Sequence, residues 1–153
     1  MKEKEKIINC GGKEYKLVFN LNVMQEIQNE YGTLEKWGDL TDGFVYDENG
    51  EKIPMKDKNN QVITKSVNDA NGNITQKVVY KTKEINIKAL IFGIRLMINE
   101  AIDIENETAE IKKAYLNDKQ VGRIVTEIGI YNATSELNQV VIDSTKSDNQ
   151  KNE

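Results

Sequence analysis

The segment from Ile85 to Ile102 constrains the fold of this chain more than any other part of its sequence. Apolar residues recur in it at three- and four-residue spacing, as they do on one face of an α-helix. That face is formed by Ile87, Leu90, Ile91, Ile94, Met97, Ile98 and Ala101. Further apolar positions around most of the remaining circumference are Ile85, Ala89, Phe92 and Leu96. We therefore expect a central helix that must be covered on nearly all sides, with part of that cover coming from another subunit.

Charged residues in the slightly longer apolar stretch from Ile85 to Ile104 argue against a membrane span. They are Lys88, Arg95, Glu100 and Asp103, and each would have to enter the hydrocarbon layer. The first residues, Met1 to Lys6, alternate in charge and do not form the apolar stretch of a signal peptide. A single cysteine, Cys10, suits a reducing compartment. We expect a cytoplasmic protein.

Composition excludes several classes of function. The 153 residues fit one domain and contain no histidine, which removes Ser-His and Cys-His catalysis and the histidine-containing zinc sites. One cysteine forms no internal disulfide. With 21 Lys and Arg against 25 Asp and Glu, the net charge of −4 gives no electrostatic case for nucleic acid as the main partner. We expect a protein-binding chain that is not an enzyme and uses no cofactor or metal.

The N-terminal third is expected to form a β-hairpin followed by two helices. Gly11-Gly12 lies between the β-prone runs of a hairpin from Lys6 to Phe19 and supplies the positive φ of a tight turn. Asn20 or Asn22 then caps a helix that ends at Gly32. Thr33 caps a short second helix, in which Trp37 is interpreted as a core anchor.

A polar β-ribbon is predicted from Thr41 to Lys83, inserted into the main body and projecting from it. Asn49-Gly50 and Asn71-Gly72 each lie between β-prone runs and favour two hairpins with type I′ turns. The stretch from Pro54 to Gln61 is interpreted as a solvated connection between them. We identify no internal repeat in the chain.

Two amphipathic helices are expected near the C-terminus, separated by Gly129. Asn117, with Gln120 three residues later, has the pattern of a capping box. From Asp143 to Glu153 the sequence contains no apolar residue, so this segment is predicted to be a disordered tail. The expected fold is thus α+β: a single domain over 1–142 with a mainly helical core, an N-terminal hairpin, an inserted ribbon at 41–83 and a polar tail at 143–153.

Three patterns that suggest a chemical site are each better explained otherwise. Asp69 to Asn73 has alternate oxygen side chains, but Gly72 is fourth rather than sixth, as a calcium loop would require. Gly11-Gly12-Lys13 lacks the spacing of a phosphate-binding loop. The acidic run of Asp103, Glu105, Glu107 and Glu110 is typical of a solvated helix boundary. No catalytic motif remains.

The order of these segments resembles the tail assembly chaperones of long-tailed bacteriophages that infect low-GC Gram-positive bacteria. The resemblance is carried by Gly12–Phe19 (GKEYKLVF), Asn22–Gly32 (NVMQEIQNEYG), Ala89–Ala101 (ALIFGIRLMINEA) and Asp118–Val125 (DKQVGRIV). It implies a small, mainly helical α+β protein of the host cytoplasm that is absent from the mature virion. It also implies two partners, the tape measure protein, which it shields, and the tail tube protein, whose subunits it helps to recruit.

We place the contact surface of such a chaperone on the two C-terminal helices. The expected binding residues are Val121, Ile124, Val125, Ile128, Leu137, Val140 and Val141. Two other functions stay open: a structural tail component such as a terminator or connector, and a small regulatory module that binds a host protein. The sequence leaves undecided the oligomeric state, including a homo-oligomer, and the existence of a longer frameshifted form.

Overall fold

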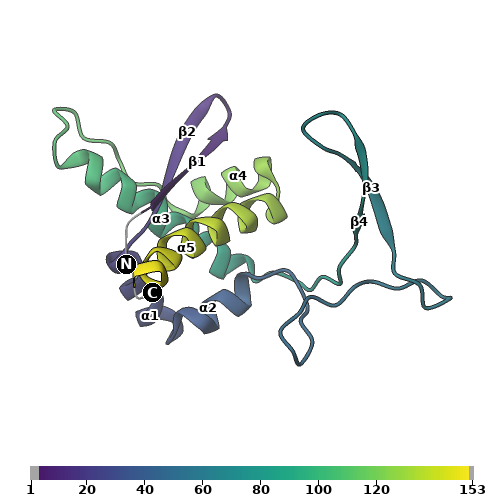
Figure 1. Cartoon of the computed structure of the whole chain (residues 1–153). Helices are drawn as coiled ribbons and strands as arrows, with labels where there is room; N and C mark the ends of the chain where they lie inside the picture. The colour runs from purple at the N-terminus through teal and green to yellow at the C-terminus, as the bar shows by residue number, and fades with distance from the viewer. Residues whose placement is uncertain (1–3, 152–153) are drawn as a thin grey trace. The chain divides into compact units, whose positions relative to one another are not determined.

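The computed structural model describes residues 4–151, and over these residues it has five helices and two antiparallel sheets of two strands (Figure 1). The expected α+β class is confirmed. The chain divides into two compact units, one formed by Gly43–Glu84 and the other by the parts of the chain before and after it. Thr41, where we expected the insertion to begin, is instead the buried last residue of a helix of the main unit.

The main unit starts with the expected hairpin, β1 (Lys4–Cys10) and β2 (Lys13–Phe19), joined by Gly11-Gly12. Both glycines have positive φ, 59° and 76°, which a two-residue turn of this kind requires. Leu17 and Phe19 are fully buried, and so is Val18 on the opposite face at 3% exposure. The end of β2 is therefore covered on both faces, since helices contact it from more than one side.

Two helices follow directly, α1 (Leu21–Tyr31) and α2 (Leu34–Thr41). The Asn20 side chain accepts the Val23 N–H, so Asn20 is the N-cap and the alternative cap at Asn22 is wrong. Gly32, with φ of 89°, ends α1, and Thr33 caps α2 through the Lys36 N–H, both as expected.

The central helix α3 (Ile87–Asn106) is contacted by β2, α1, α2, α4 and α5. Trp37 of α2 fixes one of these contacts, because its indole Nε1–H donates to the Ala89 carbonyl at 3.0 Å while the ring is 1% exposed. The ring lies over Gly93, where an added Cβ would be 2.4 Å from Trp37 Cζ2. Leu137 of the last helix reaches the same glycine, with its Cδ1 3.1 Å from that Cβ position. A residue without a side chain is thus required at the centre of α3.

After α3 the chain runs back along this helix in an extended segment before α4 (Asp118–Ile128) begins. The Asn99 side chain of α3 pairs with both backbone groups of Leu116, donating to its C=O at 3.0 Å and accepting from its N–H at 2.9 Å. Asn106, one heptad later, holds Lys113 in the same way. These two amides fix the path of the segment, and through it the start of α4.

The last helix, α5 (Ile130–Lys151), continues beyond the point where we expected the chain to become disordered. Ser144 is fully buried on it, one turn after Val140. The predicted disordered tail from Asp143 is therefore wrong as far as Lys151, because polar residues extend a helix whose apolar face is already packed. The end of the predicted tail, 152–153, lies outside the described residues.

The second unit contains three hairpin turns, not two, and all three have one geometry. In each, an aspartate carboxylate accepts the backbone N–H groups two and four residues later, at 2.9 to 3.0 Å. The aspartates are Asp47, Asp57 and Asp69. The fourth residue of each turn has positive φ: Gly50, Asn60 and Gly72. Only this residue does, so the predicted type I′ turns are wrong, and the turns are instead of the three-residue type.

Closed rings of backbone hydrogen bonds join the three hairpins, the longest of which is formed by β3 (Thr64–Asn68) and β4 (Ile74–Val78). In one ring Val45 donates to Lys81, Lys81 to Ile53, and Ile53 to Val45, at 2.8 to 3.2 Å. Met55, Val79 and Ile63 form a second ring in the same way. Each ring is a point where three extended segments meet. The stretch that we interpreted as a solvated connection is thus an ordered hairpin.

Gly93→Ala tests the contact between Trp37 and α3. The new methyl group collides with a ring that a hydrogen bond holds in place, so we expect a loss of about 1–3 kcal/mol in the free energy of unfolding. The control is Gly38→Ala in α2, where no heavy atom lies within 4 Å of the added Cβ and stability should rise by up to about 1 kcal/mol. Urea unfolding curves measure both. Equal stability of the Gly93→Ala variant and the wild type would contradict the packing described.

Asp57→Ala tests the turn that the sequence analysis did not predict. The variant loses the acceptor of the Asn59 and Gln61 N–H groups, at about 0.5–1.5 kcal/mol for each hydrogen bond, so these two amides should exchange with solvent roughly fivefold faster. Asp57→Asn keeps an oxygen acceptor and should stay closer to the wild type. Hydrogen exchange followed by NMR distinguishes them. Wild-type exchange rates in both variants would mean that the carboxylate does not hold the turn.

Candidate functional site

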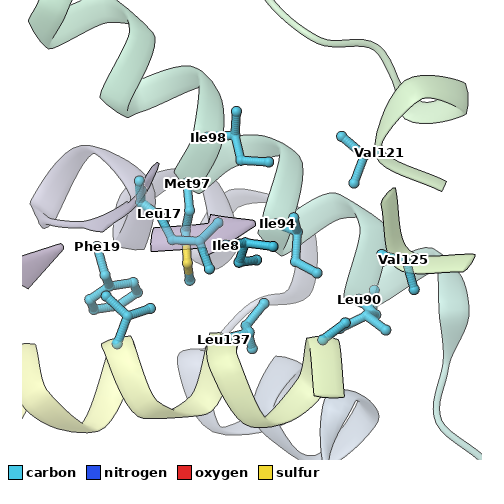
Figure 2. Packing of buried hydrophobic residues seen from close by; sticks show 14 of the residues in the cluster. Ile8, Leu17, Phe19, Leu90, Ile94, Met97, Ile98, Val121, Val125 and Leu137 are labelled. Atoms are coloured by element: carbon cyan, nitrogen blue, oxygen red, sulfur yellow. The ribbon is translucent and has the colours of Figure 1, made fainter. Parts of the chain in front are cut away.

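The residues that we predicted to form the contact surface lie mostly in the hydrophobic core. Five of the seven are at most 5% exposed: Val121, Ile124, Val125, Leu137 and Val140. Ile128 and Val141 are partly buried and pack against the same cluster. Figure 2 shows Val121 and Val125 of α4 and Leu137 of α5 among the side chains of α3 and the hairpin. The predicted groove is therefore corrected: these apolar faces pack on the rest of their own chain.

The central helix is covered in the same way. Leu90, Ile94 and Met97 are fully buried, and Ile98 is 2% exposed, within the single chain. We expected part of this cover to come from another subunit, but β2 and the four other helices supply it. Apolar surface remains open at the start of the helix, where Ile87 is 41% exposed.

This open surface belongs to a groove between the first turns of α3 and the length of α4. The groove has a volume of about 680 Å³. Its lining is formed by Ile87, Ile91, Lys119, Gly122, Arg123, Val125, Thr126, Gly129 and Ile130. Val125 is thus the member of the predicted set that reaches it. We name this feature the α3–α4 groove and take it as the candidate site.

Local sequence fixes the two walls of the α3–α4 groove. The Asn117 side chain accepts the Gln120 N–H, and the Gln120 side chain accepts the Asn117 N–H, which completes the expected capping box at the start of α4. Arg95 of α3 forms an ion pair with Asp118 at 2.7 Å and ties this start to α3. At the other end, Gly129 has φ of 94°, ends α4 and begins the turn into α5. Ile130 follows it and is 41% exposed.

The rim of the groove is basic on the α4 side. Lys119 and Arg123 lie four residues apart and therefore on one face of that helix, and both are exposed. Neither forms an ion pair with any residue in the described range 4–151. Their charges are thus available to a partner. Sequence reasoning missed these two residues, although their spacing beside an apolar helix face was a visible signal.

A second cavity, of about 570 Å³, lies between the hairpin and the extended segment after α3. Glu105 lines this cavity, and its carboxylate forms ion pairs with the Nζ atoms of Lys113 at 2.7 Å and Lys16 at 3.4 Å. The hydrogen bond from Lys113 lowers the pKa of the Glu105 carboxyl, so it stays ionised and paired. One member of the acidic run, Glu105, thus belongs to an ion-pair network. Within residues 4–151 no group of three or more Cys, Asp or Glu is placed to hold a metal ion.

Cys10 lies beside the hairpin turn, and its Sγ–H donates to Glu127 Oε2 of α4 at 3.1 Å. This hydrogen bond is the main cause that raises the pKa of the Cys10 thiol above its ordinary value. A thiol held in its protonated form is a weak nucleophile. Asp69, in the segment with alternate oxygen side chains, accepts two backbone N–H groups of its turn through Oδ1, as the hairpin interpretation of this segment requires.

Comparisons of the chain with protein-family models, curated proteins and solved structures found no match. No helix within the described residues combines the length and the apolar character needed to cross a membrane.

Proposed function

We propose that this chain is a non-enzymatic assembly chaperone of a bacteriophage tail, which binds the tape measure protein and shields it until tail tube subunits replace it. The observation that carries the proposal is the α3–α4 groove. Aliphatic side chains and glycines line its centre, and such a lining binds apolar side chains of another polypeptide. We infer the client, the tape measure protein, from the resemblance of the segment order to that of phage tail assembly chaperones.

The position of the groove also supports a chaperone. It lies on the surface of the folded main unit, where Ile87 and Ile130 are each 41% exposed, so a client can bind and leave without opening the core. One such groove offers a small contact area, and a single contact is therefore expected to be weak. Many copies bound along one long client would give strong shielding that tube subunits can still displace step by step.

Co-expression of the tagged chain with the tape measure protein of the same phage tests this proposal. We expect the two to co-purify and Ile87→Asp to lose the client, because a carboxylate then occupies the exposed apolar wall. The matched control is Ile111→Asp, at a side chain that is 88% exposed and outside the groove. This variant should keep the client. Circular dichroism checks that both variants fold.

The protein content of purified virions distinguishes the alternatives. A chaperone is absent from them, whereas a terminator or connector is present in a fixed number of copies. Failure of the wild-type chain to retain the tape measure protein, together with its presence in virions, would contradict the proposal. Retention of a host protein in place of the tape measure protein would favour a regulatory module.

A further inference from the structure

The α3–α4 groove is open along its length and has two helical walls. Ile87 and Ile91 lie one turn apart on α3 and form one wall, and Val125 lies on the other. Both walls are helices, so the groove offers no β-strand edge with which an extended segment could pair. Side-chain packing is what it offers, and an α-helix presents apolar side chains in one continuous row.

Two glycines let such a helix approach closely. Gly122 lies on the groove side of α4, and an added Cβ there would meet only Ile91 Cδ1 at 3.7 Å, an ordinary contact. Gly129 has no side chain at the end of the same wall. With these side chains missing, an incoming helix can bring its own larger apolar residues against α4.

The border of the groove sets the charge of the occupant. Lys119 and Arg123 follow the α4 side at four-residue spacing, and no residue in the described range forms an ion pair with either. By contrast, Arg95 nearby is paired with Asp118. A helix with carboxylates along one border of its apolar face would place them beside these two cations.

We propose that the occupant of the α3–α4 groove is an amphipathic helix of another protein, with Asp or Glu along the border of its apolar face. This inference rests on the proposed function and specifies the kind of segment that the client supplies. The preference for acidic residues is local. The chain as a whole carries a net charge of −4, and long-range attraction alone would favour a basic segment.

Two synthetic helical peptides test the inference. Both carry the same leucines at positions i, i+3, i+4 and i+7, and they differ only in whether glutamates or lysines border that face. Fluorescence anisotropy with the full-length chain measures their affinities. We expect the glutamate peptide to bind about tenfold more tightly, and this preference to shrink as salt screens the charges.

Two variants and a control locate the binding. Lys119→Glu with Arg123→Glu should reverse the preference, while Gly122→Leu should weaken both peptides because the new side chain fills the groove. Lys36→Glu with Lys58→Glu changes the net charge equally at exposed positions outside the groove and should behave as the wild type. Circular dichroism confirms that each variant is folded.

Equal or tighter binding of the lysine peptide, no binding of either peptide, or the same shift in the Lys36/Lys58 control would overturn the inference. These outcomes are separate from those that concern the function. If the wild-type chain retains the tape measure protein and the Lys119/Arg123 variant retains it equally, the chaperone stands and the acidic occupant is wrong. If the glutamate peptide binds as expected and the tape measure protein does not, the occupant stands and the client is wrong.

Discussion

The packing of the Trp37 ring on Gly93 is the contact on which the rest of the main unit depends. It brings α2 against the middle of α3, and Leu137 of α5 meets the same glycine, so three helices converge where α3 has no side chain. Close-packed interiors respond to a change of even one methyl group, and few residues other than glycine suit this position. With α2 and α5 fixed in this way, the C-terminal end of β2 is buried and the central helix is covered.

Covering α3 changes where a partner can bind. An apolar helix in a small chain suggested that neighbouring subunits would be needed, but the chain folds its own amphipathic helices onto it. The start of α3 stays open. The ion pair of Arg95 and the pairing of Asn99 with the segment before α4 fix where α4 lies on α3, and in this position α4 leaves the first turns of α3 uncovered. The groove follows from how these polar contacts position α4, and its basic rim follows from the residues on the outer face of that helix.

Local signals in the sequence predicted local structure well. The Gly11-Gly12 turn, the Thr33 cap and the capping box at Asn117 depend on a few neighbouring residues, and all three are confirmed. Periodicity identified the apolar face of α4, but it carries no information on what covers that face, and Val121 and Ile124 were assigned to the wrong environment. The turn at Asp57 was missed because Asn60 takes the positive φ where the other two turns have glycine. The pattern Asp-x-Asn-Gly/Asn at Asp47, Asp57 and Asp69 was the available signal, and it is an internal repeat that we overlooked.

Hydrogen exchange in dilute and concentrated solution tests the central claim, that a single chain buries α3. We predict that the amides of Leu90, Ile94, Met97 and Ile98 are among the slowest to exchange, and that their rates do not change with protein concentration. Protection of these amides that appears only when the chain associates at higher concentration would contradict this account, because the cover of α3 would then come from another copy.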